Sequence, residues 1–230
     1  MLFGGMQKLT TLDFPGVVSA LFFTQGCNFH CPYCHNPQLI PMRPENAENA
    51  VSEADALSFL TKRRDVLDGV VISGGEPCLQ PDLEAFCRTV KSLGYKIKLD
   101  TNGFFPGVVS ALLTASLLDY VAVDVKTAPQ DYAPALCRQS NAGESLAKTL
   151  DILAASAVRF EVRTTCVAPF VTADTVQTMA EIVDERVPWF FQRANLDDDA
   201  VAKGMRALSD DEIRGLLALV APRKPLAAFR

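Results

Sequence analysis

Three cysteines lie close together in the first part of the chain, at Cys27, Cys31 and Cys34. Thiolates this close in sequence, in a reducing compartment, are typical of ligands for a metal ion or an iron–sulfur cluster. The usual ligand set of a [4Fe–4S] cluster is four cysteines, so three thiolates would leave one iron open to another ligand. The Cys-x₃-Cys-x₂-Cys spacing therefore predicts a cluster with one open position.

Two other interpretations of this loop stay open. A zinc site of the Cys₃His kind could recruit His30 or His35, the two histidines of the chain, although a zinc finger places a second ligand pair further along. The thiols could also be unligated. The seven cysteines of the chain are an odd number, which argues against a disulfide scaffold. The four outside the loop are interpreted as small core side chains: Cys78, Cys87, Cys137 and Cys166.

Composition narrows the class of protein that carries this loop. Of the 230 residues, 49% are hydrophobic and 21% are charged, which is the range of globular proteins. The net charge of −5 argues against a nucleic-acid partner. No apolar run reaches the ~18 residues of a membrane span, and the first residues lack the features of a secretory signal. We therefore expect a soluble, cytoplasmic protein that does not bind membranes.

The loop must be positioned by alternating strands and helices. Strands are predicted at 17–24, 69–73, 95–100, 119–125, 158–166 and 187–192. Helices are predicted at 52–65, 81–93, 107–117, 143–156, 173–185 and 210–221. Consecutive βα units imply a parallel sheet with right-handed crossovers, either open or forming a partial barrel. The cysteine loop follows the first of these strands, at the end where βα loops form functional sites.

Charged residues occupy one face of three predicted strands: Lys96, Lys98 and Asp100, then Asp124 and Lys126, then Arg159, Glu161 and Arg163. A parallel strand that is buried on both faces should instead be a continuous apolar run. The pattern fits a barrel whose polar lumen binds something charged, and it fits equally well a half-exposed sheet with its polar face in water.

Local signals give further expectations. Pro81 is expected at the first helical position of its helix, Gly94 at its end, and Ser209 at the start of a capping box with Glu212. Asp197 to Asp199 are expected in a solvated loop. A frayed terminus is expected for the basic residues at the end of the chain: Arg223, Lys224 and Arg230.

The motifs together resemble those of radical S-adenosylmethionine (SAM) enzymes. The cysteine loop, with Tyr33 before its last cysteine, resembles their cysteine signature, and residues 73–77, Ser-Gly-Gly-Glu-Pro, resemble their Gly-Gly-Glu-Pro motif. The sequences of three segments resemble those of activating enzymes of glycyl radical enzymes: residues 26–37, 99–103 and 119–126.

The opening, residues 7–16, resembles the group that activates anaerobic ribonucleoside-triphosphate reductase, and the resemblance covers about residues 5–195. It implies an α/β fold, a partial (β/α)₆ TIM-like barrel with parallel strands and a polar lumen. A single domain is expected over 1–230, with its core at about 16–195 and a C-terminal helix at about 209–222.

The resemblance also implies cofactors and roles. Cys27, Cys31 and Cys34 would hold a [4Fe–4S] cluster, whose open iron would take the amine and carboxylate of SAM. One electron from the cluster would cleave SAM, and the 5′-deoxyadenosyl radical would abstract a hydrogen atom from the substrate. The protein would supply orientation and electrostatics. Tyr33 would pack over the cluster or the adenine. His30, His35 and Asn36 are interpreted as groups that structure the loop rather than as ligands.

Further SAM contacts are implied at the ends of other strands. Gly74, Gly75 and Glu76 would approach the SAM amino group, the alternative being a tight turn with an exposed Glu76.

Another group of residues is expected around the SAM pocket and a nearby monovalent cation, with Lys126 also a catalytic candidate: Asp100, Thr101, Asp124 and Lys126. Ion pairs of Lys126 with Asp100 or Asp124 are the alternative. Arg163 is a candidate for the SAM carboxylate or ribose, and an ion pair with Glu161 or another carboxylate is its alternative.

The expected function is that of an activase, which places a glycyl radical on a partner enzyme, here anaerobic ribonucleotide reductase. Its electron donor would be of the flavodoxin or ferredoxin type. Two alternatives stay open. One is a radical SAM enzyme that acts on a small molecule, like carboxy-deazaguanine synthase, and the other is a non-catalytic module that binds zinc or a cluster.

Overall fold

The computed structural model describes residues 1–44 and 50–230. The chain divides into two compact units, each assembled from separate stretches of sequence. The first unit comprises residues 1–28, 36–101 and 107–121, and the second comprises 29–35, 102–106 and 122–230. The cysteine loop passes from the first unit into the second, with Cys27 in the first and Cys31 and Cys34 in the second.

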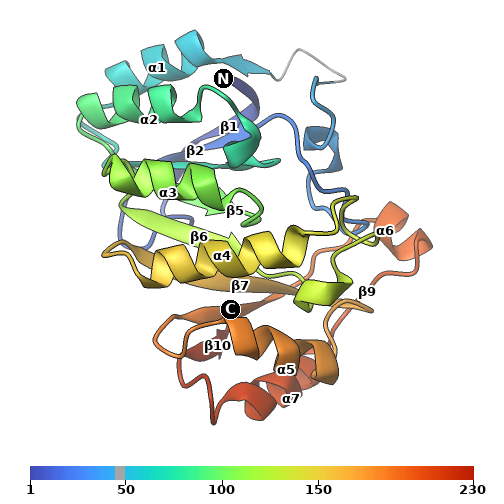
Figure 1. The fold of residues 1–230 in the computed structure, drawn as a ribbon. Helices are drawn as coiled ribbons and strands as arrows, with labels where there is room; N and C mark the ends of the chain where they lie inside the picture. The colour runs from blue at the N-terminus through green and yellow to red at the C-terminus, as the bar shows by residue number, and fades with distance from the viewer. Residues whose placement is uncertain (45–49) are drawn as a thin grey trace. The chain divides into compact units, whose positions relative to one another are not determined.

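The first unit contains a sheet with a parallel centre. Strands β2 (Ser19–Thr24), β4 (Gly69–Gly74) and β5 (Lys96–Thr101) pair in parallel, in that order. Strand β1 (Leu2–Thr10) pairs antiparallel with both β2 and β3 (Val51–Ser52) (Figure 1). The prediction did not include β1, whose Gly-Gly sequence is a poor strand signal.

The helices of this unit follow its strands, as expected for βα units. They are α1 (Glu53–Lys62), α2 (Leu83–Ser92) and α3 (Pro106–Thr114), with short 3₁₀ turns η1 (Pro37–Leu39) and η3 (Pro77–Leu79). Helices α1 and α2 lie side by side in Figure 1. The Phe86 ring of α2 packs 5.2 Å from the Phe3 ring of β1, so aromatic side chains join helix and sheet in the core.

The second unit is built around β7 (Arg159–Ala168) and β8 (Trp189–Arg193), which pair in parallel. Strand β10 (Ala227–Phe229) pairs in parallel with β8, and β9 (Arg206–Ala207) pairs antiparallel with β7. Strand β6 (Tyr120–Asp124) spans the boundary between the units, with its last three residues in the second.

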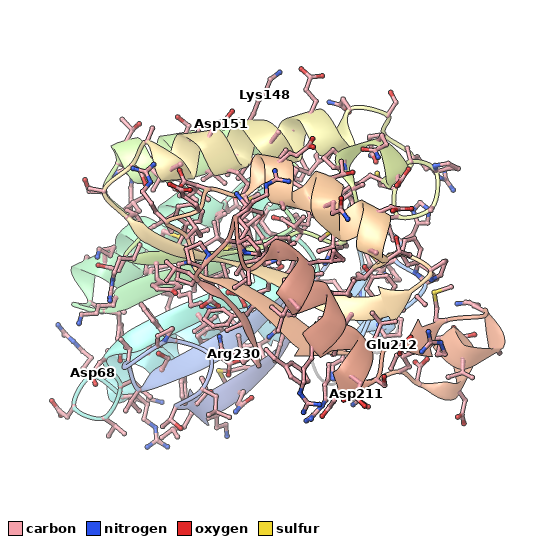
Figure 2. The ribbon with its side chains drawn as sticks, turned by 90° about the horizontal axis from the view of Figure 1, so that it is seen from below. Asp68, Lys148, Asp151, Asp211, Glu212 and Arg230 are labelled. Atoms are coloured by element: carbon pink, nitrogen blue, oxygen red, sulfur yellow. The ribbon has the colours of Figure 1, made fainter. Side chains whose placement is uncertain are left out.

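The second unit has helices α4 (Ala142–Ala154), α5 (Ala173–Ile182), α6 (Asp198–Ala202) and α7 (Asp210–Val220), and a 3₁₀ turn η4 (Pro129–Asp131). Helices α5 and α7 are neighbours (Figure 1). Ser209 and Glu212 form the predicted capping box at the start of α7. Figure 2 labels Glu212 on this helix.

The charged faces of β5 and β7 are buried at the central positions of these strands. Lys98 on β5 is 1% exposed and Glu161 on β7 is 2% exposed, so these positions do not face water. Lys96 and Arg159, at the starts of the same strands, are exposed. A sheet with its polar face in water is therefore not what the structure shows for the central positions of β5 and β7.

Three local expectations were wrong. Helix α2 begins at Leu83 rather than at Pro81, because the Leu83 N–H donates to the Gln80 carbonyl in a turn that precedes the helix. Asp198 and Asp199 lie in α6 rather than in a loop, and the exposed Asp197 side chain caps this helix by accepting a bond of 2.8 Å from the Ala200 N–H.

The C-terminal residues are not frayed either. The Arg230 guanidinium lies 3.5 Å from the Glu161 carboxylate and 5.1 Å from the centre of the Phe190 ring. Lys224 donates to the Val183 carbonyl. These contacts and the pairing of β10 with β8 hold the end of the chain against the second unit.

Candidate active site

The seven cysteines separate into two groups by their environment. Cys27, Cys31 and Cys34 are partly exposed, and the four outside the loop are buried, as predicted for core side chains. None of the seven forms a disulfide. The chain therefore offers accessible thiols as soft donors only in the loop with cluster-ligand spacing, and this donor chemistry fits an iron–sulfur cluster.

Backbone hydrogen bonds shape the loop on each side. In the first unit the Cys27 N–H donates to the Ile40 carbonyl at 3.1 Å, and in the second the Cys34 N–H donates to the Cys31 carbonyl at 3.1 Å. Among residues 1–44 and 50–230, no three His, Cys, Asp or Glu side chains form a group that could hold a metal ion. The ligand assignment therefore stays a prediction.

His30 helps to hold the loop in the second unit. Its N–H donates to the Leu136 carbonyl at 2.8 Å, and its ring Nε2 lies 3.3 Å from the Pro134 carbonyl oxygen. Cys137, which follows Leu136 in the chain, pairs with Phe29 in an isolated antiparallel β-bridge. His30 is thus a loop-structuring group, as the sequence interpretation expected.

Tyr33 is buried beside the two cysteines of the second unit. Its ring packs 5.3 Å from the Phe170 ring. Its hydroxyl oxygen is buried and has no hydrogen-bond partner among the described residues. A buried hydroxyl without a partner is costly, so it marks a place that a polar ligand group could complete.

A cavity of about 260 Å³ adjoins Tyr33. The residues that line it come from the cysteine loop and from the segment after β8: Tyr33, Cys34, His35, Asn195, Leu196, Asp197 and Ala200. The sequence analysis assigned no functional role to the segment after β8, because its polar residues carry no motif. The cavity and the unpartnered hydroxyl together fit a bound cofactor next to the loop.

Lys126 and Arg163 both bind Asp124, which is the last residue of β6, and Arg163 lies in the middle of β7. Lys126 Nζ lies 3.2 Å from Asp124 Oδ2, and Arg163 Nε lies 2.9 Å from Asp124 Oδ1. Burial by itself would raise the pKa of Asp124, but Arg163 and Lys126 outweigh it and lower that pKa to about 2. The three side chains carry two positive charges and one negative charge.

The Lys126 side chain remains protonated beside the cysteine loop. Burial alone would lower its pKa, but Asp124, Cys31 and Tyr33 raise it well above the usual value. Burial raises the pKa of the Cys31 thiol to about 11, and the Lys126 ammonium opposes this rise. The Lys126 backbone N–H donates to the Tyr132 hydroxyl at 2.9 Å, a contact that sequence spacing did not reveal.

In the first unit, the Gly-Gly-Glu motif forms a tight turn after β4. Gly74 has a φ of +113°, and a Cβ on it would lie 2.3 Å from the Thr24 backbone nitrogen. A Cβ on Gly75 would lie 2.1 Å from the Gly26 carbonyl oxygen. The structure therefore requires glycine here for packing against the chain's own backbone.

Glu76 is fully buried, so the alternative of an exposed charge was wrong. Its Oε1 accepts hydrogen bonds from the Cys78 N–H at 2.9 Å and from the Thr101 hydroxyl at 2.8 Å. The carboxylate thus lies between the ends of β4 and β5, held by donors of the chain itself.

Asp100 is paired within its own strand. Lys98 Nζ lies 2.7 Å from Asp100 Oδ1, and both side chains are almost entirely buried. Of the two ion pairs expected as alternatives for Lys126, the structure confirms the pair with Asp124, whereas Asp100 pairs with Lys98. The monovalent cation stays a prediction.

The sequence comparisons identify the family. The sequence model of the Radical SAM superfamily matches residues 21–185. The chain belongs to the radical SAM superfamily. The members of this superfamily are enzymes that use a [4Fe–4S] cluster and SAM, which confirms both predicted cofactors at the level of the family. A non-catalytic module is therefore no longer an alternative.

Two relatives place this radical SAM chain more closely. The protein MJ1227 of Methanocaldococcus jannaschii, whose name assigns it to the glycyl-radical enzyme activating enzymes, is 33% identical over 94% of this chain and 90% of its own length. The pyruvate formate-lyase-activating enzyme of Staphylococcus epidermidis is 35% identical over 42% of this chain and 39% of its own. The predicted branch, the glycyl-radical enzyme activating enzymes, is confirmed.

A solved structure confirms the fold of this radical SAM enzyme. SuiB of Streptococcus suis, in its structure bound to S-adenosylmethionine, matches with a TM-score of 0.65 and 14% identity, over 91% of this chain and 49% of that one. The predicted α/β partial barrel with mostly parallel strands is thus correct. No helix among the described residues has the length and apolar character to cross a membrane.

Proposed function

We propose that this enzyme places a glycyl radical on anaerobic ribonucleotide reductase. The observation that carries the proposal is the set of three partly exposed cysteines, none in a disulfide, in a chain that is similar to MJ1227 over nearly its whole length. The partner is inferred from residues 7–16, which resemble the reductase-activating group. The chain would act as one domain over residues 1–230, in the cytoplasm, with an electron donor of the flavodoxin or ferredoxin type.

Cys27, Cys31 and Cys34 would hold the cluster through their thiolates. When bound, the cluster and SAM supply a one-electron cleavage that yields a hydrogen-abstracting radical. The protein's task is to bind both cofactors, orient them and keep water away from the reaction. Tyr33, buried beside the loop, would close one side of this space and offer its hydroxyl to the bound cofactor.

Two groups of opposite charge would receive the amino-acid part of SAM. Glu76 would accept the ammonium group, supported by its buried carboxylate at the end of β4 and by the Gly74–Gly75 turn that places it. Lys126 and Arg163 would face the carboxylate, because with Asp124 they carry a net charge of +1. Asp100 and Thr101 would support the first group from β5.

The partner can be tested directly. Reconstituted protein, SAM, a reductant and anaerobic ribonucleotide reductase are combined without oxygen, and the reductase is examined by electron paramagnetic resonance. A glycyl radical signal on the reductase, absent with Cys31→Ala and present with the buried-thiol control Cys87→Ala, supports the proposal. SAM cleavage with no radical on the reductase would reject this partner and favour a different glycyl radical enzyme or a small-molecule substrate.

A further inference from the structure

Three buried side chains of the first unit form a hydrogen-bonded network that the Gly-Gly-Glu-Pro motif alone does not explain. Glu76, Cys78 and Thr101 are each at most 4% exposed. The Thr101 hydroxyl lies 2.8 Å from Glu76 Oε1, and the Cys78 Sγ lies 3.7 Å from Thr101 Oγ1. The Cys78 backbone N–H adds a second bond to Glu76 Oε1 at 2.9 Å.

The direction of these bonds follows from proton count. A hydroxyl has one hydrogen, so Thr101, which donates to the Glu76 carboxylate, accepts from the Cys78 S–H. Burial, and then the Glu76 charge, raise the pKa of the Cys78 thiol well above its usual value, so the thiol keeps the hydrogen that it donates. The bonds run in one direction, from S–H to O–H to carboxylate, and each polarises the next.

The network joins two strands at the end where the site lies. Thr101 is the last residue of β5, and Glu76 and Cys78 follow β4, its parallel neighbour. These two hydrogen bonds restrain the rotation of the Glu76 side chain. The ammonium group of SAM would then be received by a carboxylate whose orientation is set by β5 as well as by the turn.

We propose that Cys78 and Thr101 are positioning residues that hold the Glu76 carboxylate for the SAM ammonium group. The proposal rests on the proposed function, in which Glu76 binds SAM. Neither residue needs to contact SAM for this role. Cys78, interpreted from sequence as a small core side chain, thereby gains a role through its thiol as well as through its volume.

SAM affinity tests this role. Thr101→Val removes the hydroxyl with little change in shape and should weaken SAM binding to the reconstituted protein about 10-fold, because it removes a bond to a charged group. Cys78→Ala should weaken it about 3-fold, and Cys78→Ser, which keeps a donor, should restore it. Cys87→Ala, which removes a buried thiol outside the network, should leave the affinity unchanged.

The outcomes separate the two claims. Variants at Cys78 and Thr101 that bind SAM as tightly as the wild type would overturn the positioning role and leave the proposed function intact. Wild-type protein that holds the cluster but binds no SAM would instead contradict the proposed function. Thermal unfolding and iron content of each variant show whether a lost affinity reflects a lost fold.

An infrared measurement reads the network without any cofactor. The S–H stretching band of Cys78 is identified as the band that disappears in Cys78→Ala. Thr101→Val should shift this band to the higher frequency of an unbonded thiol, and Thr101→Ser, which keeps the hydroxyl, should leave it in place. A band that does not move in Thr101→Val would overturn the network and with it the positioning role.

Discussion

Arg163 Nε lies 2.9 Å from Asp124 Oδ1, and the opposite oxygen of the same carboxylate is bound by Lys126. This arrangement fixes one anion, at the end of β6, between two cations of the second unit. Removing either cation changes the charge that the site presents as well as the stability of the fold. The relationship therefore has consequences that can be measured in the free protein.

Arg163→Met should raise the pKa of Asp124 above its wild-type value of about 2. The ordinary pKa is 3.8, so ionised Asp124 stabilises the wild-type fold fully above about pH 4, and this contribution is lost as pH falls towards 2. In the variant this contribution is smaller above about pH 4, so the protein should reach its acid-unfolding midpoint at a higher pH. Acid unfolding followed by circular dichroism measures the midpoint.

The control for this titration is Arg88→Met, which breaks an exposed pair with Glu84 on α2. Surface pairs contribute little, so its acid midpoint should equal that of the wild type. Equal midpoints for Arg163→Met and Arg88→Met would show that Arg163 does not lower the pKa of Asp124.

Lys98→Met should destabilise the protein by about 3 kcal/mol, because it leaves the buried Asp100 without this ion-pair partner. The double variant Lys98→Met/Asp100→Asn should recover part of the loss. Urea unfolding measures each variant. Lys148→Met, which removes an exposed pair with Glu144, should change the free energy of unfolding by less than about 0.5 kcal/mol. A Lys98→Met effect no larger than this control would contradict a strong buried pair.

Gly75→Ala should destabilise the protein by about 2 kcal/mol, because the new Cβ would meet the Gly26 carbonyl oxygen at 2.1 Å. The turn next to Cys27 must shift, so the iron content after reconstitution should fall as well. Gly107→Ala is the matched control, since a Cβ there has open space within 4 Å. Full iron content and unchanged stability in Gly75→Ala would show that the turn tolerates a side chain.

Tyr33→Phe should have opposite effects in the two states of the protein. In the free protein it removes a buried hydroxyl without a partner and should increase stability by about 1 kcal/mol. In the reconstituted protein it should weaken SAM binding. Urea unfolding and equilibrium binding measure the two effects. A loss of stability in the free protein would mean that the hydroxyl already has a favourable contact.

The six predicted strands and six predicted helices are all present, because runs of β-branched residues and helical periodicity are local signals. The Lys98–Asp100 pair could also be predicted from the sequence, because residues two apart in a strand share a face. The contacts that the sequence could not reveal join residues that lie far apart in the chain. Tyr132 packs 5.9 Å from the Phe29 ring, and His30 reaches Pro134, without any motif that links them.

The sequence analysis predicted which residues belong to the candidate site better than it predicted why the fold requires them. Spacing singled out Cys27, Cys31 and Cys34, and the structure sets these three apart by their exposure. The glycines at 74 and 75 were expected for the approach of a ligand, yet the chain's own backbone already requires them. Such backbone approaches depend on strand pairing, which a single sequence does not specify.

The most direct test of the central claim is reductive cleavage of SAM. Protein reconstituted with iron and sulfide without oxygen is reduced, given SAM, and assayed for 5′-deoxyadenosine, beside Cys31→Ala and Cys87→Ala. We predict product from the wild type and from Cys87→Ala, and none from Cys31→Ala. A wild-type protein with a loaded, reduced [4Fe–4S] cluster that forms no 5′-deoxyadenosine, even with candidate partners present, would contradict the account.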